Sequence, residues 1–334
     1  MTCNINENFS VVYRPIEKDE QDKALNLWYS VFETHNPGCF ERDFNSEAAP
    51  TYQYGDTIGA WYDGQLVSAV HIRRFILQSR DDGIKYLCGG ISNVATLQNY
   101  RNQGFSRHLL RLAIKRMEQN DEFSLSILGT GQYNHYSVLG WEQMNTPHRI
   151  TIEWKNFDST MNKMKWCSTS EIFSSDKELI LALHTKNPRE YQFDRSPSSV
   201  FEHFVGWNWQ LNEAIIYIYR EEEFGYVVIS KPNNINDIYV SEWRAPNIDV
   251  ERKLLKIAAE EIYRRQEQQT NIIRFHGLPQ YMTIDELEQW AGKIKIDYNV
   301  NMMIRNIRLL KKTIDKIITA YSKGSATFWP ADIF

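Results

Sequence analysis

Cysteine is scarce in this chain of 334 residues. The four cysteines are far apart in the sequence: Cys3, Cys39, Cys88 and Cys167. A disulfide framework needs paired cysteines at compatible spacings, and no such spacing is present. We therefore expect free thiols, most of them buried as small apolar side chains, in a protein of a reducing compartment.

Long apolar runs are also missing. No stretch approaches the roughly 18 consecutive apolar residues that a membrane-spanning helix needs. The segment from Met1 to Arg14 has no basic region followed by an apolar stretch, which an export signal would show. The expectation is a cytoplasmic protein with no membrane partner.

The chain has no excess of basic charge. It contains 38 lysines and arginines against 42 aspartates and glutamates, so its formal net charge is −4. A nucleic-acid-binding protein usually carries a basic face that neutralises phosphates, so we expect no nucleic-acid partner. The eight histidines show no metal-binding spacing such as His-Glu-x-x-His, so no metal is expected. A small-molecule substrate suits this composition better, and the oligomeric state cannot be predicted from it.

The chain contains enough apolar residues for more than one hydrophobic core. Hydrophobic residues make up 42% of the chain, and a chain of this length usually divides into two domains. We predict a first domain over residues 1–155, a second over 166–280 and a short C-terminal segment over 281–334. A polar stretch at 158–175 is the predicted linker.

The first half combines helical and alternating patterns. Apolar residues spaced for one helical face predict a helix over 20–32, and two alternating runs at 57–62 and 66–77 predict a hairpin turning at Asp63-Gly64. Further elements are a strand over 86–96, a helix from 105, a strand over 123–128, a short helix over 133–139 and a strand over 141–154. This order indicates a mixed α+β fold, a sheet covered by helices.

The second half repeats this order more loosely. Strands are predicted at 214–220, 225–231 and 237–243, followed by a helix over 249–268 and a strand over 271–276. The connection between that third strand and that helix contains Arg244, Ala245, Pro246 and Asn247, with no glycine. We therefore expect a scaffold copy without its own phosphate site. A helix over 284–290, a strand over 300–307 and a basic amphipathic helix over 309–321 complete the chain.

The connection between strand and helix at Arg101–Arg107 has the properties of a phosphate site. The first N–H groups of a helix lack intrahelical partners and lie at the positive end of the helix dipole, which favours an anion. Gly104 places no side chain in the way of a pyrophosphate, and Arg101 and Arg107 add positive charge. The alternative is an ordinary helix start flanked by surface arginines.

This connection resembles the fingerprint of the GNAT N-acetyltransferase superfamily: Arg or Gln, two residues, Gly, one residue, then Gly or Ala. Here the fingerprint runs from Arg101 to Ser106. Ser106 stands where the family has Gly or Ala, and Gln98 stands where such proteins often have proline. About thirty residues later, Tyr136 precedes Gly140 and Trp141 as in the family's short helix. Two motifs in the correct order imply a GNAT fold and acetyl-coenzyme A as co-substrate.

The plan of one complete domain, one degenerate copy and a C-terminal segment is similar to the enhanced-intracellular-survival type of acetyltransferase. This resemblance implies tandem GNAT-like domains and direct transfer of an acetyl group to a primary amine, on a small molecule or a lysine. It makes Tyr136 the acid that protonates the leaving thiolate, with Tyr133 as the rival, and the terminal carboxylate of Phe334 the base. The C-terminal segment is shorter than the third domain of that group.

Further residues receive roles by this resemblance. The expected cofactor contacts are Val94, Ala95, Thr96, Arg101, Asn102, Gln103, Gly104, Phe105, Ser106 and Arg107. Apart from the resemblance, an aromatic and acidic cluster in the first helix and the loop after it suggests acceptor contacts from Trp28, Phe32 and Phe40. The cluster also contains His35, Glu41, Asp43 and Phe44, and a packed core with solvated acids explains it equally well. Two other functions stay open: a non-catalytic acyl-coenzyme A sensor, and another acyl-coenzyme A reaction on the same fold.

Overall fold

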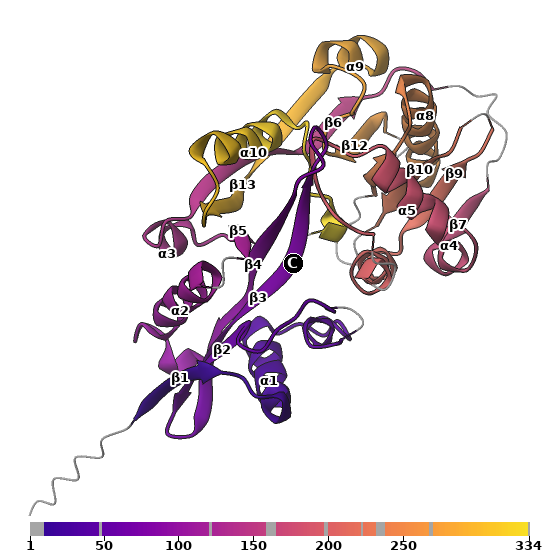
Figure 1. The fold of residues 1–334 in the computed structure, drawn as a ribbon. Coiled ribbons are helices and arrows are strands. Elements are labelled where there is room, and N and C mark those ends of the chain that lie inside the picture. The colour runs from indigo at the N-terminus through magenta and orange to yellow at the C-terminus, as the bar shows by residue number, and fades with distance from the viewer. Residues whose placement is uncertain are drawn as a thin grey trace, which may run out of the picture.

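The computed structural model describes residues 10–46, 49–119, 122–157, 165–196, 200–221, 223–231, 238–266 and 270–332. Its sheet runs through the whole molecule in the order β1-β2-β3-β4-β5-β13-β6-β12-β11-β10-β9-β7, with β8 paired to β3 (Figure 1). The mixed sheet covered by helices is as the sequence predicts, whereas the joining of both halves into one sheet was not predicted.

The N-terminal half supplies the first six strands. Its elements are β1 (Val11–Pro15), α1 (Gln21–Phe32), β2 (Thr57–Tyr62), β3 (Gln65–Ser79), β4 (Lys85–Thr96), α2 (Phe105–Gln119), β5 (Phe123–Gly129), α3 (Tyr133–Ser137) and β6 (Glu142–Glu153). The β2–β3 connection is the predicted tight turn, since Asp63 and Gly64 both have positive φ, 48° and 76°.

The remaining elements follow after residue 165. They are β7 (Trp166–Ser168), α4 (Thr169–Ser175), α5 (Lys177–Lys186), β8 (Tyr191–Phe193), α7 (Trp207–Leu211), β9 (Ile215–Tyr219), β10 (Gly225–Ser230), β11 (Tyr239–Arg244), α8 (Ile248–Arg265), β12 (Ile272–His276), α9 (Ile284–Ala291), β13 (Ile294–Asn306) and α10 (Lys311–Lys323). The predicted linker is wrong over residues 166–175, which form β7 and α4. Two of the polar residues that suggested a linker, Ser168 and Glu171, instead form the capping box that starts α4.

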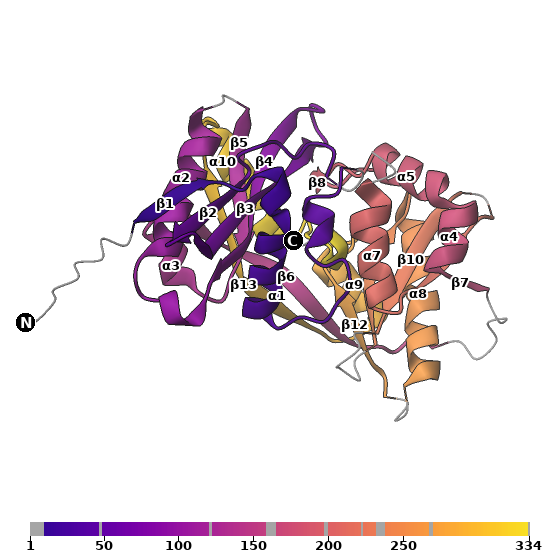
Figure 2. The same cartoon turned by 90° about the horizontal axis from the view of Figure 1, so that it is seen from below.

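Helices cover both faces of the sheet (Figure 2). Successive strand residues point to opposite faces, and on β3 Ala69 joins the core under α1 whereas Val70 joins the core under α2. In the other half, Val227 packs with the α8 core and its neighbour Val228 with the α4–α5 core. The two halves therefore share a three-layer arrangement.

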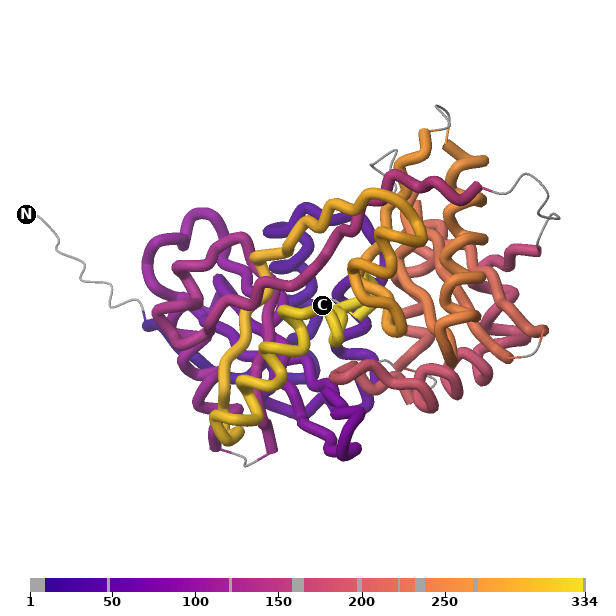
Figure 3. The backbone as a smooth tube through the Cα atoms, turned by 90° about the horizontal axis from the view of Figure 1, so that it is seen from above, coloured from indigo at the N-terminus to yellow at the C-terminus, as the bar shows by residue number. Residues whose placement is uncertain are grey.

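The last strand of each half crosses to the other half. β13, from the C-terminal segment, lies between β5 and β6 and is antiparallel to both. β6 in turn pairs with β12 of the second half, so it has partners from later in the chain on both sides (Figure 3). Residues of the predicted segment 281–334 thus complete the sheet of the N-terminal half. In the described part of the chain, no helix is both long and apolar enough to cross a bilayer.

Candidate functional site

β4 separates from β5 half-way along its length. The parallel pairing of the two strands ends at Gly90 and Ile127, while β4 continues to Thr96 beside β3. At this point β4 carries a bulge, since Asn93 and Val94 lie opposite the single residue Val70 and Asn93 has a φ of 52°. The edge of β4 beyond Gly90 therefore faces an opening rather than a neighbouring strand.

The start of α2 lies beside this opening. The hydrogen bonds of the helix begin with the His108 N–H, which donates to the Gly104 carbonyl oxygen at 3.0 Å. The N–H groups of the three residues before His108 therefore have no acceptor within the helix. Gly104 has a φ of 85°, which favours glycine, and an added Cβ would meet no atom within 4 Å. The backbone is therefore exposed to whatever occupies the opening.

A cleft of about 340 Å³ connects these features. Its lining residues come from α1, β4, the following loop, α2 and α3: Val31, Val94, Thr96, Tyr100, Arg101, Asn102, Gly104, Phe105, Ser106, Gln132, His135 and Tyr136. Seven of the ten predicted cofactor contacts are in this set. Ala95 is not, because it is 1% exposed and packs under α1. Gln103 and Arg107 are exposed beside the cleft without lining it.

Tyr136 closes one wall of the cleft. Its side chain is 9% exposed and its ring meets Trp141 edge-on, with centroids 6.1 Å apart. Burial raises the pKa of Tyr136 to about 12, against a smaller lowering by a hydrogen bond with Thr130, so the hydroxyl keeps its proton at neutral pH. Tyr133, the rival, is 43% exposed and does not line the cleft.

The C-terminal segment supports the turn that carries Tyr136. Arg305 of β13 donates a hydrogen bond to the Leu139 carbonyl oxygen, contacts Glu118 at 3.2 Å and lies over the Trp141 ring at 5.6 Å. Next to Tyr136 on α3, His135 Nε2 is 3.3 Å from Ser106 Oγ, and this contact links α3 to the start of α2.

The three predicted acceptor residues lie in different environments. Trp28 is fully buried, Phe40 is 5% exposed, and their rings pack 5.7 Å apart beneath α1. Phe32 is 45% exposed next to Phe40, so it is the one of the three that a solute can reach directly. Acceptor binding by these residues stays a prediction.

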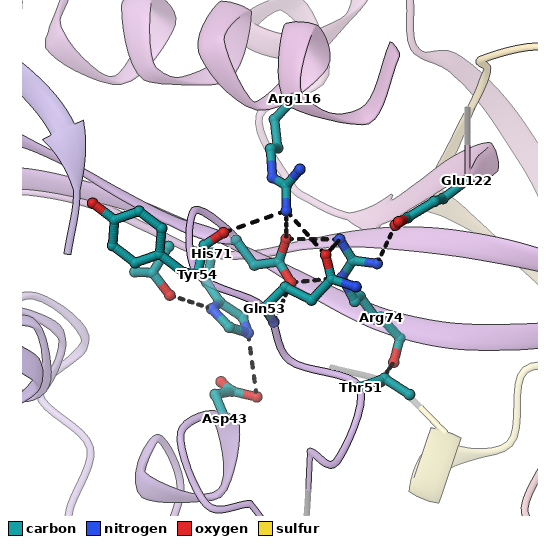
Figure 4. Close-up of polar contacts among 10 residues, drawn as sticks. Asp43, Thr51, Gln53, Tyr54, His71, Arg74, Arg116 and Glu122 are labelled. Carbon is teal, nitrogen blue, oxygen red and sulfur yellow. Dashed lines mark hydrogen bonds and ion pairs between the residues drawn. The ribbon is translucent and has the colours of Figure 1, made fainter. Parts of the chain in front are cut away.

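Two polar clusters beside β3 were missed by sequence reasoning (Figure 4). In the first, Arg74 Nε donates to Asp56 Oδ2 at 2.6 Å and Arg74 Nη1 to Glu122 at 2.7 Å. In the second, His71 Nδ1 is 2.8 Å from Thr57 Oγ1, while Asp43 lies beyond Nε2 of the ring at 3.9 Å. The residues of each cluster are far apart in sequence, so no local pattern predicts either cluster.

Among the described residues of the second half, the connection before α8 differs from the connection before α2. The N-terminus of α8 is capped by its own sequence, because Asn247 Oδ1 accepts from the Val250 N–H at 3.0 Å. Arg244, at the position corresponding to the end of β4, is 1% exposed and donates to Gln192 at 2.8 Å. The start of α8 therefore has a side-chain cap and a buried arginine where the start of α2 has the open Gly104 loop.

The described part of the C-terminal tail, up to Asp332, lies at the junction of the two halves (Figures 1 and 2). Trp329 is buried against Trp243, and Arg195 Nη2 pairs with Asp332 at 2.7 Å. Phe334, the predicted base, lies outside the described residues. No group of three His, Cys, Asp or Glu side chains suited to a metal occurs in the part of the chain that the structure describes.

The family follows from a sequence match over this site. Residues 12–144 match the model of the acetyltransferase (GNAT) domain, and this segment contains the open edge of β4, the Gly104 loop and Tyr136. Residues 12–144 are thus a GNAT acetyltransferase domain by similarity. This domain makes the protein an acyltransferase, and acyl-coenzyme A is the co-substrate of the GNAT family.

Solved structures share the fold of this chain at low sequence identity. A probable N-acyltransferase of unknown function from Enterococcus faecalis is 19% identical with a TM-score of 0.68, over 90% of this chain and 73% of that one. Eis1 from Mycobacterium abscessus is 12% identical with a TM-score of 0.61, over 89% and 74%. N-myristoyltransferase from Saccharomyces cerevisiae with bound myristoyl-coenzyme A is 11% identical with a TM-score of 0.51, over 90% and 80%. No curated protein sequence matches the chain.

Proposed function

We propose that the protein transfers an acetyl group from acetyl-coenzyme A directly to a primary amine of a small molecule or a lysine side chain. The observation that carries this proposal is the common cleft that joins the open edge of β4, the unpaired start of α2 and the Tyr136 hydroxyl. A GNAT domain needs these three parts for cofactor binding and thiolate protonation. The match to that family over residues 12–144 supports the same reaction.

In this mechanism each part of the cleft has one task. The pyrophosphate binds at the N-terminus of α2 near Gly104, where helix-start N–H groups and the helix dipole attract an anion. The pantetheine arm extends along the open edge of β4 at Val94–Thr96, whose backbone amides are the candidate donors to the arm and to the thioester oxygen. A hydrogen bond to that oxygen stabilises the negative charge that develops on it in the transition state.

The chemical step moves two protons. The neutral amine attacks the thioester carbonyl carbon, the C–N bond forms and the C–S bond breaks. Tyr136 gives its proton to the departing sulfur, which its raised pKa permits because the hydroxyl is protonated at neutral pH. The proton of the amine goes to a base, for which we propose the carboxylate of Phe334.

Calorimetry and thiol release test the proposal on three proteins: wild type, Gly104→Glu and Tyr136→Phe. We expect Gly104→Glu to abolish acetyl-coenzyme A binding, because a charged side chain would fill the phosphate position and repel the anion. We expect Tyr136→Phe to bind normally and to lose about 10²- to 10⁴-fold in amine-dependent thiol release. The amine panel should include free amines and a lysine peptide.

Two results would contradict the proposal. A wild type that binds acetyl-coenzyme A but releases no thiol with any amine would favour the sensor function. A wild type that does not bind acetyl-coenzyme A would remove the assignment altogether. A Gly83→Glu variant is the matched control, since Gly83 also has a positive φ and open space at its Cβ but lies far from the cleft in the β3–β4 turn.

A further inference from the structure

The bulge in β4 depends on one residue in an unusual conformation. Asn93 has a φ of 52°, a left-handed conformation that costs most residues about 1–2 kcal/mol and that asparagine tolerates better than most. It lies where β4 leaves β5, directly before Val94, which lines the cleft beside α2. The orientation of the Val94 peptide group therefore depends on how Asn93 is held.

A buried carboxylate holds Asn93. Asn93 Nδ2 donates to Asp43 Oδ2 at 2.7 Å. The other oxygen of Asp43 accepts from Arg73 at 3.0 Å from Nε and at 2.8 Å from Nη2, and Asp43 is 1% exposed. Burial disfavours the charged carboxylate, but Arg73, His71 and Arg42 outweigh this effect and lower the pKa of Asp43. The side chain is thus an ionised acceptor with both oxygens in use.

Asp43 belongs to a segment that bridges the two halves of the protein. It lies in the short 3-10 helix Glu41–Asp43, after α1. In the same segment Arg42 lies over the Trp207 ring at 4.1 Å, and the Pro37 carbonyl oxygen accepts from Trp207 Nε1 at 3.0 Å. The segment after α1 is also where acceptor contacts are expected. A single hydrogen bond between Asp43 and Asn93 therefore connects this segment with the cofactor strand.

We propose that Asp43 is a positioning residue of the acetyl transfer: through Asn93 it fixes the β4 bulge, so that the Val94 backbone N–H is aimed at the thioester oxygen. Asp43 touches neither substrate nor cofactor in this role. The inference rests on the proposed function, because it assumes that the open edge of β4 binds the thioester.

Substitution of Asn93 by glycine separates the effect of the Asp43–Asn93 hydrogen bond from the effect of the backbone conformation at residue 93. Asn93→Gly keeps easy access to positive φ and removes only the amide that Asp43 holds. We expect acetyl-coenzyme A to bind within about threefold of wild type while kcat falls at least tenfold, with an unchanged KM for the amine. This loss is smaller than the 10²- to 10³-fold typical of deleting an oxyanion donor, because the Val94 N–H is retained but less well oriented. Asp63→Gly, an exposed positive-φ position in the β2–β3 turn, is the matched control and should keep wild-type kcat.

Infrared spectroscopy of bound acetyl-coenzyme A gives a readout that a purely structural role would not change. In wild type the thioester carbonyl stretch should shift to lower frequency on binding, because a hydrogen bond polarises the C=O bond. In Asn93→Gly most of this shift should disappear. An active wild type together with an Asn93→Gly variant that keeps both kcat and the carbonyl shift would overturn the inference, and the proposed function would stand.

A second pair of variants keeps the test decisive if Asn93→Gly binds acetyl-coenzyme A poorly. Asp43→Asn retains a group that can pair with the amide of Asn93, whereas Asp43→Ala does not, and both lose the charge that faces Arg73. We expect the kcat of Asp43→Asn to be at least fivefold higher than that of Asp43→Ala. Equal values would show that charge alone, rather than the link to Asn93, is responsible, and would overturn the inference.

Discussion

Asp332 is a buried carboxylate in the C-terminal tail. Burial raises its pKa to about 6 from an ordinary value of 3.8, and Arg195 offsets only part of that effect. A carboxyl group whose pKa is higher in the folded state binds more protons there, so the free energy of unfolding falls as pH rises from about 4 to about 6. At this scale a single side chain thus makes the anchoring of the tail depend on pH.

We predict that Asp332→Asn is less sensitive to pH than wild type in this window. Between pH 4 and 6 the wild type should lose up to about 3 kcal/mol relative to the variant, since each unit of pKa shift corresponds to about 1.4 kcal/mol. Urea unfolding of both proteins at pH 4, 5, 6 and 7 measures the difference. Parallel curves for the two proteins would contradict the assignment of this shift to Asp332.

At the scale of elements, the two corresponding helices α2 and α8 begin differently. α2 starts at Gly104 with free N–H groups beside a cleft, whereas Asn247 caps α8 and Arg244 is buried before it. We therefore predict that one chain binds one acetyl-coenzyme A, and calorimetry should give a stoichiometry of 1. The cap variant Asn247→Gly should leave this value unchanged, because Arg244 and Pro246 still occupy the connection. A stoichiometry of 2 would mean that the second copy has kept a cofactor site.

At the scale of the whole molecule, strand exchange joins the halves. Ile150, Ile152 and Trp154 of the first half are at most 1% exposed and belong to the core of the second half. Burying a large apolar side chain contributes about 1.5–3 kcal/mol, so these three together amount to a large part of a typical stability of about 5–15 kcal/mol. We predict that residues 1–155 alone do not fold cooperatively, and that co-expression with residues 156–334 restores a soluble complex. Circular dichroism melting of the isolated fragment tests this, and a cooperative transition would show that the first half is independent.

Much of the secondary structure could be predicted because its signals are local. Apolar spacing located α1 and α2 to within a few residues, and Asp63-Gly64 located the β2–β3 turn. Residues of the Arg101–Ser106 fingerprint line one cleft with Tyr136, and cofactor binding in this cleft stays a prediction. The short elements β1, β7, β8 and α4 were missed, since three to seven residues carry too little periodicity to predict a helix or strand. The division into domains at residues 155 and 281 stays a prediction.

The sequence by itself determined the types of the longer elements, the GNAT resemblance and the residues at the helix start, because these depend on neighbours within one turn or one hairpin. Only the tertiary structure decided that β13 enters the sheet between β5 and β6, that Arg305 supports the turn of Tyr136, and that Asp43 holds Asn93. Asp43 and Asn93 are fifty residues apart, and Arg305 lies 166 residues from Leu139. Such contacts form only once the packed cores have brought distant strands together, and no local pattern in the chain encodes them.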